Sequence, residues 1–66
     1  MMVTANGKPR AVDEGETIAH LLERLGLPAD RVVIEHNGEA LERGSFSRTR
    51  LQAGDRIEIA QMVGGG

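Results

Sequence analysis

The stretch GETIAHLLERLGLP, residues 15–28, decides how this chain folds. Four apolar side chains recur at the i, i+3, i+4, i+7 spacing of one helix face: Ile18, Leu21, Leu22 and Leu25. Thr17 suits the N-cap, Gly26 suits the left-handed residue that follows a helix, and Pro28 prevents the helix from continuing. The stretch therefore predicts one short amphipathic helix that buries a single face against other elements.

The residues before this helix read as a β-hairpin. Apolar and polar residues alternate over residues 1–5, and Asn6-Gly7 is the pair that favours a tight type I' turn. We expect strand pairing to resume around residues 10–12. Because Pro9 has no N–H to donate, the second strand is predicted to lie at a sheet edge, with the first strand further inside.

The residues after the helix add further strands. Residues 32–34 predict a strand, Asn37-Gly38 a turn, and the chain then stays extended to Leu41. Residues 42–51 show no sustained period and are interpreted as a loop or short helical turn held in the core by Phe46 and Leu51. In RIEIAQMV, residues 56–63, alternation predicts a last strand with one buried face.

This order of elements predicts an α+β fold in which one helix packs on a mixed sheet of four to five strands. If the first and last strands are central neighbours, the second strand lies at an edge, as Pro9 requires. That arrangement is the β-grasp, or ubiquitin-like, fold. We expect a single domain over residues 1–63, followed by a flexible glycine tail over residues 64–66.

Composition excludes several classes of function. Eight Lys and Arg against ten Asp and Glu lack the basic excess that holds a nucleic acid. Without cysteine there is neither a disulfide framework nor a thiolate metal site. No apolar run approaches the roughly 20 residues that span a bilayer. We therefore expect a soluble, cytoplasmic protein that contacts neither nucleic acid nor membrane.

The side chains suggest no catalytic machinery. His20 and His36 lack metal-ligand spacing and are interpreted as surface or structural histidines. No nucleophile-base motif is recognisable, and a domain of this size offers little depth for a substrate pocket. The charged residues on the helix and strands are taken as a solvated face. No catalytic residue and no metal ligand is predicted, so function must come from binding or from the chain end.

The chain end is chemically suited to activation. Terminal glycines are often simply mobile, but here they directly follow a predicted strand. Glycine leaves the acyl carbon uncrowded, and three extended residues reach about 10 Å, enough to enter a partner's active site. Strand parity places Met62 opposite the buried face, so we expect its side chain to be exposed. Met62 and Val63 are accordingly predicted to dock on a partner.

Several motifs together resemble a known family. NGKP after the first strand, TIAHLLERL, VVIEHNGEAL and LQAGDRIEIAQMVGGG resemble, along the whole chain, the sulfur carrier proteins of thiamin biosynthesis. The most specific part is the closing Leu-x-x-Gly-Asp-x-Ile-Glu-Ile pattern, which begins at Leu51 and precedes the glycine end.

The resemblance implies a carrier acted on by other enzymes, with no stably bound cofactor of its own. An E1-like adenylyltransferase would use ATP and Mg to adenylate Gly66, and a cysteine desulfurase or other persulfide donor would convert it to a thiocarboxylate. The thiocarboxylate would then give its sulfur to thiazole synthase. In this family the tail enters the partner's active site, so Gly64 and Gly65 correspond to the threading segment.

Three alternatives remain open at this point. The related small subunit of molybdopterin synthase shares the fold and the thiocarboxylate, although its members tend to be longer. A ubiquitin-like modifier would form isopeptide bonds, but the single lysine, Lys8, suits a polymer poorly. A plain interaction module would have an inert tail, and it would be indifferent to the removal of Gly66.

Overall fold

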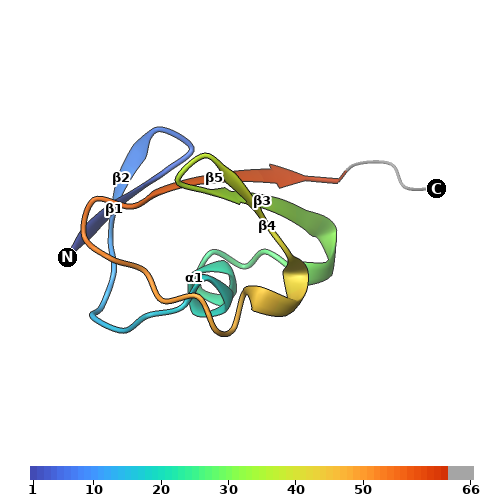
Figure 1. The fold of residues 1–66 in the computed structure, drawn as a ribbon, viewed down its shortest axis with the longest axis horizontal. Coiled ribbons are helices and arrows are strands. Elements are labelled where there is room, and N and C mark those ends of the chain that lie inside the picture. Colours follow the sequence, from blue (N-terminus) through green and yellow to red (C-terminus); the bar gives the residue numbers. More distant parts are fainter. Residues whose placement is uncertain (63–66) are drawn as a thin grey trace.

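The computed structural model describes residues 1–62 of the chain, and over these residues five strands and one α-helix form. The elements are β1 (Met2–Ala5), β2 (Lys8–Ala11), α1 (Ile18–Arg24), β3 (Val32–His36), β4 (Glu39–Leu41) and β5 (Arg56–Gln61). Two short 3₁₀ turns, Ala29–Arg31 and Arg43–Ser45, precede β3 and follow β4. The strands make one sheet in the order β2-β1-β5-β3-β4 (Figure 1).

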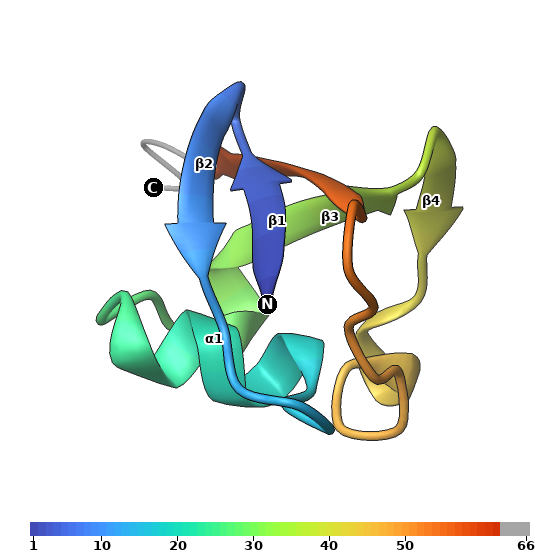
Figure 2. The ribbon, with the colours of Figure 1, turned by 90° about the vertical axis from the view of Figure 1, so that its left-hand side faces the viewer.

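The topology is the predicted β-grasp, with five strands in the sheet. β1 and β5 are parallel neighbours at its centre, paired through Thr4 with Arg56 and Ala5 with Ile57. All other pairings are antiparallel. Figure 2 shows α1 lying across one face of the sheet, with β2 and β4 at the two edges. The opposite face, called the outer face below, is left uncovered by the helix.

The edge position of β2 confirms the reading of Pro9, but the strand begins earlier than predicted. Its pairing starts at Lys8 opposite Ala5, not around residue 10. Met1 and Val12 exchange both backbone hydrogen bonds, so alternation turns the N position of Pro9 away from β1. The missing N–H therefore falls on the free edge of the sheet, where it interrupts no ladder.

Both predicted ends of the helix are confirmed. The Thr17 hydroxyl accepts a hydrogen bond from the N–H of His20 at 3.1 Å. At the other end Gly26 has φ of 72°, its N–H donates to Glu23 at 3.0 Å, and the N–H of Leu27 donates to Leu22 at 2.9 Å. This pair of bonds is the Schellman motif, which glycine favours because it adopts positive φ without strain.

The core lies between α1 and the inner face of the sheet. Phe46 and Leu51 are 3% and 2% exposed, which confirms that they hold the segment after β4 against the core. That segment contains the 3₁₀ turn Arg43–Ser45, so the predicted short helical turn is also present. The buried core residues are Val3, Val12, Ile18, Leu21, Leu22, Val32, Ile34, Phe46, Leu51 and Ile57.

Candidate functional site

The described chain ends at Met62, directly after the central strand. Four residues that the sequence predicts to be functional lie outside the described residues: Val63, Gly64, Gly65 and Gly66. The N–H of Met62 donates to the carbonyl of Arg31 at 2.8 Å, so β5 stays paired with the chain before β3 up to this point. A strand held at the centre of a sheet is a fixed base for the residues that follow it.

Met62 belongs to an exposed apolar surface on the outer face. Its side chain is 47% exposed, as the strand parity predicted, and Val33 is 53% exposed. Val33 pairs with Ala60, which lies two residues before Met62 on the same face of β5. We call Val33, Ala60 and Met62 the outer-face patch. Val33 is not among the docking residues predicted from the sequence, although its position between Val32 and Ile34, which are buried, was a signal that its side chain points outward.

Two carboxylates flank this patch. Glu35 and Glu58 are directly opposite each other on β3 and β5, and both are exposed. They line a shallow depression of about 270 Å³ together with Val33 and Ala60. Like charges at facing positions of a sheet lower its stability. The outer-face patch thus has an acidic margin. The repulsion between its two carboxylates lowers the stability of the folded protein.

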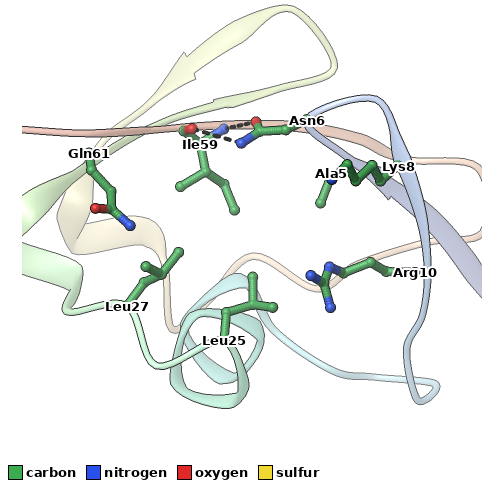
Figure 3. Close-up of a pocket in the computed structure, with 8 residues that line it drawn as sticks. All are labelled: Ala5, Asn6, Lys8, Arg10, Leu25, Leu27, Ile59 and Gln61. Atoms are coloured by element: carbon green, nitrogen blue, oxygen red, sulfur yellow. Dashed lines mark hydrogen bonds between the residues drawn. The ribbon is translucent and has the colours of Figure 1, made fainter.

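Asn6 fastens β5 from the other side. Its Oδ1 accepts from the N–H of Ile59 at 2.7 Å, and its Nδ2 donates to the carbonyl of the same residue at 3.0 Å (Figure 3). Asn6 has φ of 52°, as expected in an Asn-Gly turn, so the chain turns away from β5 at this residue. The side-chain amide of Asn6 still reaches β5. A single side chain thus makes the two hydrogen bonds that a neighbouring strand would otherwise make with Ile59.

Asn37 does the same at the start of β5. In the second Asn-Gly turn, with φ of 53°, its Oδ1 accepts from the N–H of Arg56 at 2.8 Å. Its Nδ2 donates to Asp55 at 3.1 Å. The sequence identified both asparagines as turn formers only. Their second role depends on contacts across 53 and 19 residues, for which the local pattern carries no signal.

The charged residues of the helix and strands are exposed, as expected, but Asp55, in the turn before β5, is buried. It is 8% exposed, accepts from the N–H of Gln52 at 2.9 Å, and lies 2.8 Å from Nε2 of His36. Burial alone would raise the pKa of Asp55, but the hydrogen bonds from His36, the Gln52 amide and Asn37 outweigh it and lower the pKa. His36 is accordingly a structural histidine.

Glu16, in the loop before α1, is the second buried carboxylate. It is 5% exposed, accepts from the N–H of Asp13 at 2.9 Å, and contacts Arg24 at 2.8 Å and His20 at 3.0 Å. Burial raises the pKa of Glu16, whereas Arg24, the Asp13 amide and His20 together lower it further, so the carboxylate stays charged. These contacts join the loop after β2 to α1 and have no reactive partner.

The two buried carboxylates therefore serve structure. Over residues 1–62 no group of three or more His, Asp and Glu side chains is placed to hold a metal ion. Nor does any helix in this part of the chain have the length and apolar character needed to cross a membrane. The features with functional potential are the end of β5, the outer-face patch and the groove shown in Figure 3.

Comparison with known proteins points to one family. The sequence model of the ThiS family matches residues 3–66. The sulfur carrier protein ThiS of Thermus thermophilus is 34% identical over 65 residues, which cover 98% of this chain and all of that protein. A thiazole synthase of Magnetococcus marinus is 35% identical over the whole of this chain, which spans only 20% of that protein's length. A thiazole synthase of Paramagnetospirillum magneticum gives the same coverage at 32% identity.

Solved structures agree with this result. The crystal structure of the thiamine biosynthesis protein ThiS from Geobacter metallireducens superposes with a TM-score of 0.83 at 42% identity. The match covers all of both chains. The solution structure of the thiamine biosynthesis protein from the same organism gives a TM-score of 0.80 over all of this chain and 88% of that one.

Proposed function

The chain belongs to the ThiS family, and we propose that it carries sulfur for thiamin biosynthesis on the carboxylate of Gly66. The observation that carries this proposal is the extent of the family match, which runs through residue 66 and so includes the glycine end. The same match favours a thiamin carrier over the small subunit of molybdopterin synthase. We take residues 1–63 as the domain and 64–66 as its working tail.

The proposed chemistry begins with activation. A carboxylate oxygen of Gly66 attacks the α-phosphorus of ATP in an E1-like enzyme that also holds Mg, and pyrophosphate leaves. A persulfide sulfur from a cysteine desulfurase or similar donor then displaces AMP from the acyl carbon. A thiol cleaves the resulting sulfur–sulfur bond and frees the thiocarboxylate. Glycine suits each step because no side chain crowds the carbon under attack.

The proposed acceptor of the sulfur is thiazole synthase. Two relatives with that name contain a segment similar to the whole of this chain, so carrier-like and synthase sequences occur within one protein there. We propose that the segment described here acts as a cosubstrate of these enzymes and performs no catalysis itself. Gly64 and Gly65 serve as the segment that threads into each active site.

We assign docking to the outer-face patch, and we keep Val63 as a predicted docking residue from the sequence. Val33 and Met62 are two of the three large apolar side chains exposed in residues 1–62, and they lie beside the base of the tail. Exposed apolar side chains grouped in this way typically mark a protein contact. The acidic margin formed by Glu35 and Glu58 suits a partner surface that carries arginine or lysine.

The test is the intact mass of the protein after incubation with ATP, Mg, the activating enzyme and a sulfur donor. We expect one oxygen to be replaced by sulfur, with fragmentation placing the change at Gly66. A variant that lacks Gly66 is the matched control and should remain unmodified. An unchanged mass, in a mixture that modifies a known carrier, would refute the proposal. Modification at Lys8 instead of Gly66 would favour a chemistry other than the formation of a thiocarboxylate.

A further inference from the structure

A groove separate from the outer-face patch lies between α1 and the sheet, beside the end of β5. Its volume is about 440 Å³. Leu25 and Leu27 line it from the helix end and Ile59 lines it from the sheet, and in Figure 3 their side chains point toward one another across the opening. All three are only partly buried, so the groove presents an apolar surface to solvent.

The rim of this groove is positively charged. Lys8 and Arg10 line it from β2, and both are exposed. Figure 3 shows the Arg10 guanidinium pointing into the opening. The ion pairs of the described residues join Glu16 to His20 and Arg24, and His36 to Asp55. Neither Lys8 nor Arg10 takes part in these pairs, so their charge is available to an acidic group from outside.

One wall of the groove is the edge of β5 that extends past the end of β1. β1 pairs with β5 only as far as Ile57, and Asn6 then takes both backbone groups of Ile59. The carbonyl of Ile57 and both groups of Ile59 face this edge, and by alternation the N–H and carbonyl of Gln61 face it too. Gln61 lies beyond the reach of β1 and also lines the groove.

We propose that this groove binds an extended acidic segment of a partner protein, which adds its backbone to the β5 edge at Gln61. Apolar side chains of the segment rest on Leu25, Leu27 and Ile59, and its carboxylates meet Lys8 and Arg10. Strand addition supplies backbone hydrogen bonds, while the apolar floor and the cationic rim select the sequence. The site goes beyond the carrier function and would stand even if Gly66 carried no sulfur.

A synthetic peptide tests the proposal on the full chain. The probe is acetyl-Asp-Glu-Val-Ile-Val-Asp-Glu-amide, and the matched control peptide replaces its four acidic residues with lysine. In a titration followed by amide NMR we expect shifts at Lys8, Ile59 and Gln61 with the acidic peptide only. The affinity should fall as salt rises, because the rim charges are exposed.

Variants of the protein sharpen the test. Arg10→Glu should weaken binding by about fivefold or more, whereas Arg48→Glu, the same charge change at an exposed position outside the groove, should alter it by less than about twofold. Arg10→Gln should lie between them, and it provides the answer if the reversed charge disturbs the hairpin.

Four results would overturn the proposal. They are no shifts with the acidic peptide, equal binding of the lysine peptide, shifts centred on Val33 and Met62, and shifts at the groove that grow with protein concentration alone. The last would identify a second copy of the chain as the occupant. None of these readouts depends on sulfur loading, so failure here is distinct from failure of the carrier proposal.

Discussion

The amide group of Asn6 replaces a neighbouring strand for Ile59, binding its N–H at 2.7 Å and its carbonyl at 3.0 Å. This contact joins the first turn of the chain to the strand that leads to the glycine end. It holds β5 on the side where β1 no longer accompanies it. The hydrogen bonding of β5 near its end therefore depends on a residue near the N-terminus.

The first prediction removes this contact and keeps the turn. Asn6→Gly retains the positive φ that the turn needs but deletes both hydrogen bonds to Ile59. We expect the free energy of unfolding to fall by about 1 to 2 kcal/mol, since each bond contributes about 1 kcal/mol or less net. Amide exchange at Ile59 should accelerate.

Urea unfolding and hydrogen exchange measure these two effects. Amide exchange at Ile34, which lies opposite Ile59 on β3, serves as the internal control because it should change only with global stability. Unaltered exchange at Ile59 would show that the Asn6 amide does not hold β5.

The second prediction concerns docking. Met62→Glu places a charge in the outer-face patch, and we expect the KM of the activating enzyme for this carrier to rise about tenfold, as for a residue of moderate weight in an interface. Met2→Glu is the matched control, because Met2 is equally exposed at 51% but lies on β1, away from the patch. Equal KM values for the two variants would show that the outer-face patch is not part of the docking surface.

The third prediction exploits the facing carboxylates. Glu58→Gln removes the repulsion from Glu35, and we expect the protein to become more stable by about 0.5 kcal/mol at low salt. The gain should vanish at high salt, because exposed charges are screened. The same variant should bind the activating enzyme less well if the acidic margin contacts a basic partner surface.

Chemical denaturation at two salt concentrations tests the stability effect. Glu14→Gln is the control, since Glu14 is exposed in the loop before α1 and belongs to neither the patch nor its margin. A stability gain that persists at high salt would mean that the difference in stability between glutamate and glutamine at position 58 comes from packing or strand propensity and not from charge.

The fourth prediction concerns acid. Asp55 and Glu16 have pKa values below their ordinary 3.8 and 4.5 in the folded protein, so the unfolded chain takes up protons first as the pH falls. Their contribution to stability is complete above the ordinary values and is lost as the pH falls through the lower folded values. Stability should therefore decline below about pH 4.5.

Asp55→Asn should be less stable near neutral pH and should lose less stability on acidification, because the carboxylate that takes up the proton is gone. Asp30→Asn, at an exposed position, should follow the unmodified protein. Urea unfolding across the acid range provides the measurement. A decline as steep in Asp55→Asn as in the unmodified chain would assign the acid sensitivity to other groups.

Much of the fold could be predicted from local pattern. The helix ends follow from Thr17 and Gly26, and the edge position of β2 follows from Pro9. Gly26 and Pro9 act through their own backbone, and the Thr17 hydroxyl acts on an amide only three residues away. The exposure of Met62 follows from alternation alone.

The remaining features depend on neighbours that are distant in the sequence. Asp55 is buried because His36 and Asn37 approach it from another turn, and Glu16 because Arg24 reaches back to it from α1. The Asn6 contact spans 53 residues. Such polar contacts are decided by tertiary placement, which composition and periodicity do not encode.

The central position of β5 also has a consequence during protein synthesis. The ribosome makes residues 56–61 after every other strand, yet these residues fill the middle of the sheet. Until they emerge from the exit tunnel, β1 with β2 and β3 with β4 have no common partner, and the core lacks Ile57. Parallel pairing between the first and last strands is a contact of high sequence separation, which forms late and slowly. A chain cut short before β5 would thus be an unfolded target for proteases, and only chains that extend through this strand would reach the enzymes of the pathway.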